Sequence, residues 1–444
     1  MTRFFRTALA AGLSGAVVLA AGAASALSLV RDAEIERTLR QMSAPIYQAA
    51  GLAPTSVEMY MVNDRSLNAF VVGGRRIFLH TGLLRELETP EELLGVIAHE
   101  TGHIAGGHEA RRSINLRNAQ GPALLGVLAG IAAGVAAGSP EVGVAAVSGS
   151  QGAVVRSILR NSRAEEASAD QAAINYLTRA GVNPLGLQRV IERFRGQEVL
   201  SIGNLDPYVL THPLGTERMS LMARSVAQAQ NREWTMPPEI IYWHGRMRAK
   251  LRGFLVDPTR VLDRLEGEPD TEFNLYQKAV ALHRLPDPVA ARRTVDALIA
   301  KRQKDPFYLE LKGQILHESG QAAEAVPYYR KASQIAPNEP LLKAALGRAL
   351  LQLNEPRANA EALVILKEAR SKDLADVAAL RDLATAYERA GDVGMATLAT
   401  AERYALVNNR KPAIQLARRA AKLLPQGSPG WLRAQDILKL DVEN

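Results

Sequence analysis

The sequence predicts a mainly α-helical chain, in which an α+β domain with a small edge sheet is followed by a solenoid of paired helices. Three observations support this fold class. Aromatic residues make up only 5% of the 444 residues, while alanine and leucine are abundant, which favours helices. Apolar runs at residues 57–62 and 68–79 predict short strands. From about residue 272 onward, helical patterns follow one another with an internal repeat.

The composition is that of an ordinary globular protein, with 47% hydrophobic and 23% charged residues. The length allows two or three domains. The formal charge of +8 is spread along the chain in short clusters such as Arg418-Arg419, with no long basic tract or RNA-binding signature. We therefore expect no nucleic-acid partner. Two interpretations of this charge remain: a plain solvated surface, or a basic surface that makes peripheral contact with anionic lipid or with an acidic partner.

Residues 1–26 are predicted to be a signal peptide. Two arginines lie within the first six residues, an apolar run covers residues 8–21, and Ala24-Ser25-Ala26 offers the small residues of a cleavage site. The apolar run is short for a membrane span, and an uncleaved anchor is the alternative. The chain has no cysteine, which fits an oxidising compartment. We expect a mature chain that starts near Leu27.

The first domain is predicted over residues 27–235. A helix is expected near residues 31–51, and Gly73-Gly74 predicts a turn between strands. Thr89 is a helix cap, Pro90 suits the first helical position and Glu92 completes a capping box. An uncharged Gly/Ala-rich insert covers about residues 118–155. It is interpreted as a packed helical hairpin, with a lid, a membrane-touching loop or a single weak membrane span as alternatives.

A further helix is predicted at residues 162–179, ending at Gly181. Residues 236–271 are predicted to be a helical join, with a helix at 243–254 and a loop-rich stretch at 257–269. Residues 272–444 are predicted to form tetratricopeptide-like repeats, and an unrelated helical bundle is the alternative. Such repeats stack into a curved array with a concave surface that can hold a protein segment. The small, aromatic and terminal-proline positions of the best copy are Gly313, Gly320, Ala325, Tyr329, Ala332 and Pro337. Gly347 keeps the register in the next copy until an insertion near Pro356, and later copies are marked by Tyr387, Gly391, Ala396, Ala413, Ala417, Ala420 and Pro425.

Residues 99–103 read H-E-x-x-H on a helix. His99 and His103 lie one turn apart on the same face, so both imidazoles can bind one metal ion. Glu100 lies beside the first ligand, where it can take a proton from metal-bound water. The alternative is a helix with two unrelated surface histidines. The pattern on a capped helix favours the metal site.

A catalytic zinc ion uses three protein ligands and keeps one position open. His108 falls one residue too early for the longer H-E-x-x-H-x-x-G-x-x-H pattern, and one residue is about 100° around a helix, so His108 should point elsewhere. Downstream, Glu166 and Asp170 form E-x-x-x-D on one helical face. We expect Glu166, rather than its neighbour Glu165, to be the third ligand of one Zn²⁺ ion per chain. Asp170 is placed to orient a ligand histidine.

E-x-x-x-D after H-E-x-x-H resembles the gluzincin-type peptidase family that includes HtpX and the CAAX prenyl endopeptidases. The resemblance extends through residues 31–36, Asn68-Ala69-Phe70 and residues 81–84 to the repeats. Exported members with C-terminal repeats are periplasmic proteases and chaperones of outer-membrane protein assembly in Gram-negative bacteria. The resemblance implies a zinc endopeptidase with Glu166 as third ligand. Its expected substrates are unfolded or misassembled proteins, and the repeats would bind the outer-membrane assembly machinery.

The resemblance also implies roles for His212, in the segment T-H-P-L, and for Arg218. The matching histidine of such relatives can occupy the fourth zinc position and keep the protease latent. Otherwise His212 would stabilise the oxyanion, and Arg218 would support it. Ser168 departs from relatives, in which a second glutamate is usual. A repeat scaffold or chaperone with a largely latent protease domain is the rival function. A membrane-embedded endopeptidase needs several strong spans and is rejected.

Overall fold

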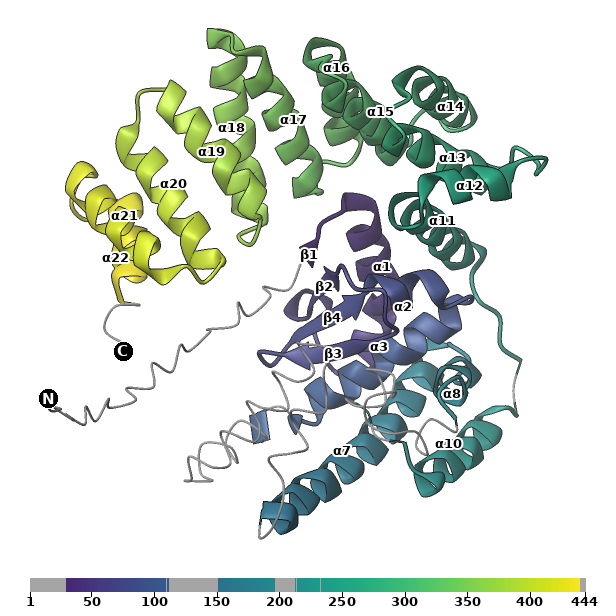
Figure 1. Cartoon of the computed structure of the whole chain (residues 1–444). Helices are drawn as coiled ribbons and strands as arrows, with labels where there is room; N and C mark the ends of the chain where they lie inside the picture. Colours follow the sequence, from purple (N-terminus) through teal and green to yellow (C-terminus); the bar gives the residue numbers. More distant parts are fainter. Residues whose placement is uncertain are drawn as a thin grey trace, which may run out of the picture.

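The computed structural model describes residues 29–108, 110–111, 151–195, 212, 214–231 and 233–439, with the backbone alone for residues 151–162 (Figure 1). The predicted signal peptide and most of the predicted insert lie outside the described residues. A unit with a small sheet lies below an arch of paired helices (Figure 1). The predicted fold class, mainly helical with a small sheet, is confirmed.

The sheet has four strands among the described residues, in the order β1-β2-β4-β3. Strands β2 (Glu58–Val62) and β4 (Arg76–His80) are parallel, and the edges are formed by β1 (Leu29–Val30) and β3 (Ala69–Val72), each antiparallel to its neighbour. The turn between β3 and β4 is made by Gly73 and Gly74, whose φ values of 69° and 86° are left-handed. The predicted strands and turn are therefore present, and β3 is left as an edge strand.

Helix α3 (Pro90–Ala105) lies at the centre of the first unit, between α1 (Ala33–Ala49), α7 (Gln151–Ala180) and α8 (Leu185–Glu192). Its predicted capping box is confirmed: the Glu92 N–H donates to Thr89 Oγ1 at 3.3 Å, and the Thr89 N–H donates to Glu92 Oε2 at 3.1 Å. Helix α7 begins eleven residues before the predicted start at residue 162. Within the residues that the structure describes, this unit also contains the α-helices α2 (Thr81–Glu86) and α10 (Thr216–Ala229).

A glycine brings α3 and α7 together. A Cβ added to Gly102 would lie only 2.8 Å from the Ala169 carbonyl oxygen of α7, closer than side chains pack. Gly102 stands between the two histidines of H-E-x-x-H, and Ala169 stands between Glu166 and Asp170. The two segments that carry the predicted ligands are thus in backbone contact.

The join contains α11 (Pro238–Leu255) and α12 (Pro258–Leu265). The prediction that residues 257–269 are loop-rich was wrong for α12. Asp257 caps this helix by accepting the Arg260 N–H at 3.1 Å, and Pro258 occupies the first helical position. Helix α12 then packs on α13 of the repeats.

The arch consists of antiparallel helix pairs, each packed on the next. Gly313 and Gly347 allow the two helices of a pair to approach, since an added Cβ would meet the Tyr329 ring at 3.0 Å and Leu366 at 2.5 Å. The insertion near Pro356 does not interrupt the array; it lengthens α18 to 17 residues. The helices are α13 (Glu272–Arg284), α14 (Pro288–Lys301), α15 (Pro306–Glu318), α16 (Ala322–Ile335), α17 (Pro340–Leu353), α18 (Pro356–Lys372), α19 (Val377–Arg389), α20 (Val393–Leu406), α21 (Arg410–Leu423) and α22 (Pro429–Leu438).

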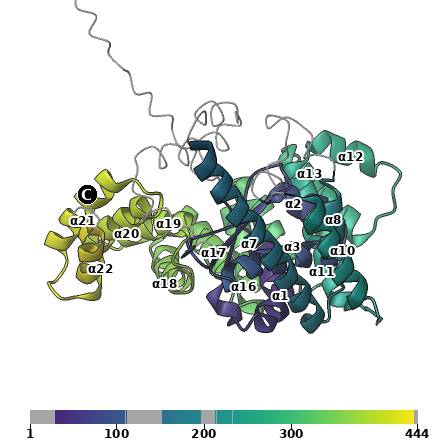
Figure 2. The same cartoon turned by 90° about the horizontal axis from the view of Figure 1, so that it is seen from below.

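Helix α1 joins the sheet unit to the arch and lies next to α17 in both views (Figures 1 and 2). Arg31, just before α1, pairs with Asp373 after α18 at 2.5 Å, and Arg40 pairs with Glu339 before α17 at 2.6 Å. Within the described residues, no helix combines the length and apolarity that crossing a membrane requires.

Buried charges reinforce this junction. The Arg246 guanidinium of α11 is fully buried and pairs with Glu34 of α1 and with Asp305, which caps α15. The Tyr276 hydroxyl of α13 donates to Glu34 at 2.5 Å, and Lys250 pairs with Glu34 at 3.3 Å. Three parts of the chain, α1, the join and the first repeats, therefore share one ionic cluster.

Candidate metal centre

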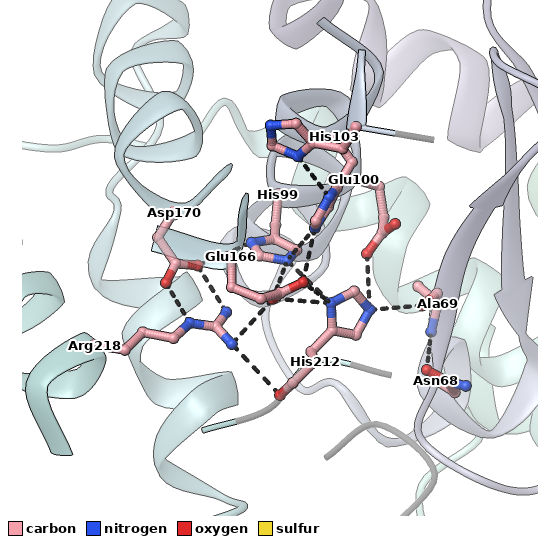
Figure 3. Close-up of polar contacts among 10 residues, drawn as sticks. Asn68, Ala69, His99, Glu100, His103, Glu166, Asp170, His212 and Arg218 are labelled. Carbon is pink, nitrogen blue, oxygen red and sulfur yellow. Dashed lines mark hydrogen bonds and ion pairs between the residues drawn. The ribbon is translucent and has the colours of Figure 1, made fainter. Parts of the chain in front are cut away.

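Four buried side chains converge between α3, α7 and the edge strand (Figure 3). Helix α3 supplies His99 and His103, α7 supplies Glu166, and His212 comes from the segment before α10. One donor atom of each lies within 4.8 Å of all the others. Three imidazoles and one carboxylate thus face a common point.

The inward atoms are Nε2 of both α3 histidines and Nδ1 of His212. Glu166 oxygens lie 3.2 Å from His99 Nε2, 3.2 Å from His103 Nε2 and 3.1 Å from His212 Nδ1. The two α3 histidines are 3.1 Å apart through their Nε2 atoms. This donor set, imidazole nitrogens with one carboxylate in a buried site, is the set that zinc takes in proteins. The residues present therefore fit a metal ion of that kind.

Asp170 and Arg218 support the site from behind. Asp170 Oδ1 lies 2.9 Å from His99 Nδ1, the ring nitrogen that points away from the cluster. Arg218 of α10 donates to both Asp170 oxygens, at 2.5 and 2.9 Å, and its Nη1 lies 3.0 Å from Glu166 (Figure 3). Each charged group in this layer is thereby paired, which buried charges require.

The charges have opposite effects on neighbouring pKa values. Burial lowers the pKa of His99, but hydrogen bonds to Asp170 and Glu166 outweigh it and raise this pKa to about 10. Burial raises the pKa of Glu166, but the charge of His212 and hydrogen bonds from the histidines hold it well below its usual value. The carboxylate is thus kept ionised, as a metal ligand must be.

Glu100 lies beside the cluster without joining it. Its Oε1 is 3.4 Å from Nε2 of His212, the ring nitrogen that faces away from Glu166. The same Nε2 lies 3.1 Å from the carbonyl oxygen of Ala69 on the edge strand β3. The His212 ring therefore fills the space between the donor cluster, the carboxylate of Glu100 and the sheet edge.

The structure brings together every residue expected at the site from the sequence: His99, Glu100, His103, Glu166, Asp170, His212 and Arg218. Glu165 does not belong to the donor cluster. His108 does not face the cluster either, as its offset indicated, but its Nδ1 lies 2.9 Å from Nδ1 of His103, on the far side of that ring. Neither this contact nor the contact of His212 with Ala69 was expected from the sequence.

Residues 30–225, just under half of the chain, match the model of Peptidase family M48, and the donor cluster is compatible with a metalloprotease. The chain is homologous to the beta-barrel assembly-enhancing proteases. The relative from Escherichia coli (strain K12) is 24% identical over 414 residues, which are 90% of this chain and 81% of the relative. The relative from Yersinia pestis is 26% identical over 74% of this chain and 68% of its own.

Among solved structures, the tetratricopeptide protein YrrB aligns with 44% of this chain and 91% of its own, with 16% identity and a TM-score of 0.29. The assignment of repeats in this chain rests on its own helix pairs and on the spacing of its glycines.

Proposed function

We propose that this chain is a periplasmic zinc endopeptidase that cleaves misfolded or stalled outer-membrane proteins and also acts on them as a chaperone. The buried cluster of His99, His103, Glu166 and His212, with Glu100 beside it, carries the proposal. Homology to proteases named for enhancing β-barrel assembly supports the substrate class. The periplasmic location is proposed from the predicted signal peptide at residues 1–26. In the proposed domain organisation, the peptidase domain covers residues 27–235 and the repeats cover residues 272–444.

In the proposed reaction, His99, His103 and Glu166 hold one zinc ion. When bound, zinc would supply a Lewis acid that polarises the scissile carbonyl and makes the attacking water more acidic. Glu100 accepts a proton from that water and later passes it to the leaving amine. Asp170 keeps His99 Nδ1 protonated, so that the opposite nitrogen is free to bind metal.

The substrate would add as a strand to β3, whose outer edge has no neighbour in the described sheet. Main-chain hydrogen bonds along such an edge give affinity without much sequence choice, which suits cleavage of unfolded chains. The His212 ring occupies the place of the substrate in two ways. Its Nδ1 lies among the metal donors, and its Nε2 lies within hydrogen-bonding distance of the Ala69 carbonyl oxygen on β3. We therefore propose that His212 keeps the protease latent, and that cleavage requires the ring to swing away. Once displaced, the ring could stabilise the oxyanion.

The second candidate is a scaffold or chaperone whose peptidase site stays closed. The position of the His212 ring in the site favours this second candidate. In this case the repeats would bind the outer-membrane assembly machinery. In cells, a defect rescued by the Glu100→Gln chain but not by a chain cut near residue 270 would support this candidate. Rescue that depends on Glu100 would support proteolysis as the main activity.

The deciding experiment is cleavage of a denatured outer-membrane β-barrel protein by the purified chain from Leu27 onward. Wild type, Glu100→Gln and His212→Ala are compared, with zinc measured for each. We expect one zinc per chain in all three, no hydrolysis by Glu100→Gln, and faster hydrolysis by His212→Ala than by wild type. General-base loss should lower the rate by roughly 10²–10⁴-fold.

Substantial cleavage by Glu100→Gln would refute its role as the base. Slower cleavage by His212→Ala than by wild type would refute latency and leave His212 as an oxyanion stabiliser. No cleavage by any of the three, despite one zinc per chain, would favour the chaperone function.

A further inference from the structure

The two α3 histidines are held from behind by different groups. His99 Nδ1 faces the carboxylate of Asp170, whereas His103 Nδ1 faces the imidazole of His108 at 2.9 Å. The His103 and His108 rings lie nearly perpendicular, at 82°, with their centroids 5.0 Å apart. His108 is 2% exposed, so its ring is shielded from bulk water.

The turn after α3 makes this contact possible. The helix ends at Ala105, Gly106 caps it, and Gly107 adopts a left-handed φ of 63° that favours glycine. A Cβ on Gly106 would come within 2.4 Å of His108 Nε2. The two glycines therefore end the helix and leave room for the His108 ring against His103. A continued helix would have carried residue 108 past this position.

The proton arrangement follows from the direction of the His103 ring. Its Nε2 faces the donor cluster, so a neutral, metal-binding His103 carries its proton on Nδ1. A hydrogen bond between the two Nδ1 atoms then requires His108 to accept, and to carry its own proton on Nε2. This pairing fixes both the tautomer and the rotation of His103.

We propose that His108 is a positioning residue whose Nδ1 accepts the Nδ1–H of His103 and holds Nε2 of that ring toward the zinc ion. The inference rests on the proposed zinc centre. It gives His103 a neutral partner where His99 has an ionised one. The site thereby gains a second oriented ligand without a further buried negative charge. Such a charge would need a counter-charge, and Arg218 is already paired with Asp170 and Glu166.

The test uses two substitutions of the full-length mature protein. His108→Phe keeps a planar ring but removes the acceptor, whereas His108→Asn keeps an acceptor oxygen near the position of Nδ1. Zinc affinity is measured by competition with a chromophoric chelator, which does not depend on activity. His244→Phe is the matched control, because His244 is also 2% exposed but belongs to α11 and lies outside the donor cluster.

We expect His108→Phe to weaken zinc binding by roughly 10–100-fold, the usual effect of losing such a partner. His108→Asn should stay within about threefold of wild type, and His244→Phe should bind zinc like wild type even if its Tm falls. The proposal is overturned if His108→Phe binds zinc like wild type, or if His108→Asn binds as weakly as His108→Phe. Should His108→Phe not fold, His108→Asn decides: near-wild-type affinity supports the acceptor role, and a tenfold loss overturns it. Failure of the wild type to bind one zinc per chain would instead refute the proposed metal centre.

Discussion

At the scale of single residues, Arg218 lies behind the donor cluster and contacts three of the site residues. The resemblance assigns it to support of the oxyanion. In the structure its guanidinium is 7% exposed, forks onto both oxygens of Asp170, and also contacts Glu166 and the carbonyl of His212. Its contacts are thus with the proposed ligand Glu166, with His212 and with Asp170, which we propose orients His99. We expect its effect on catalysis to pass through Asp170.

Arg218→Lys should separate this role from simple positive charge. Lysine keeps the charge but cannot make the two parallel hydrogen bonds of a guanidinium. We expect zinc affinity to fall by about tenfold, as measured by chelator competition. Arg224→Lys, an exposed position on the same helix, should leave zinc affinity unchanged. Unaltered affinity in Arg218→Lys would show that the fork onto Asp170 does not orient the ligands.

At the scale of elements, the metal centre depends on how closely α3 and α7 approach. Gly102 is the point of contact, and its backbone lies against Ala169. Each helix carries its site residues one turn apart, His99 with His103 and Glu166 with Asp170. A change in the spacing of the helices would therefore move the carboxylate of Glu166 away from both histidines at once.

Gly102→Ala is expected to push the helices apart. The new methyl would meet the Ala169 carbonyl at 2.8 Å, and overpacking of this kind costs about 1–3 kcal/mol. Zinc affinity should fall by on the order of tenfold, because the ligands no longer converge. The control is Gly253→Ala on α11, where an added Cβ meets Val280 at the same 2.8 Å, far along the chain from the donor residues. It should lose stability but keep zinc affinity. Equal affinities in the two variants would contradict the expectation.

Capping residues and short spacing patterns in the sequence predicted the helices whose ends and faces depend on neighbouring residues. The cap at Thr89 and the spacing of H-E-x-x-H placed α3 and its ligands, and E-x-x-x-D placed Glu166 and Asp170. The α12 helix was missed, although Asp257 caps it and Pro258 occupies its first helical position. The contact of His108 could not be predicted by extending α3, since the helix ends at Ala105 and Gly107 adopts a left-handed φ.

Contacts between residues far apart in the sequence became visible only in the folded structure. His212 lies 113 residues from His99, and periodicity says nothing about a pair so far apart. Only the family resemblance suggested His212 from the sequence. The contact of His212 with the Ala69 carbonyl depends on strand order, which places β3 rather than β4 at the sheet edge.

At the scale of the whole molecule, the ionic cluster around Arg246 holds the peptidase unit, the join and the first repeats together. Its guanidinium is fully buried between Glu34 and Asp305. Removing one partner of such a cluster strands the others in a medium that solvates charge poorly. The Arg246 side chain therefore helps to fix the relative position of the two units, together with the Arg31–Asp373 and Arg40–Glu339 pairs.

Arg246→Met should destabilise the folded chain by roughly 3–5 kcal/mol, because it leaves Asp305 without its counter-charge and Glu34 with Lys250 alone. Urea unfolding measures this loss. Arg302→Met is the matched control, since the side chain of Arg302 is 47% exposed in its pair with Glu272. That pair should contribute about 0–1 kcal/mol. A loss in Arg246→Met no larger than in the control would mean that the cluster does not hold the units together.

The pairing of α1 with the arch has a consequence for the order in which the molecule can be completed. A chain made from its N-terminus presents α1 first, yet Arg40 and Arg31 meet their partners only 299 and 342 residues later. Contacts this distant in sequence form late and slowly. A nascent chain can thus bury α3, which carries His99 and His103, well before α1 meets its last neighbours. The last neighbours of α1 lie in the final third of the chain. A truncated product that lacks this part is therefore left with a catalytic unit in which α1 is incompletely covered.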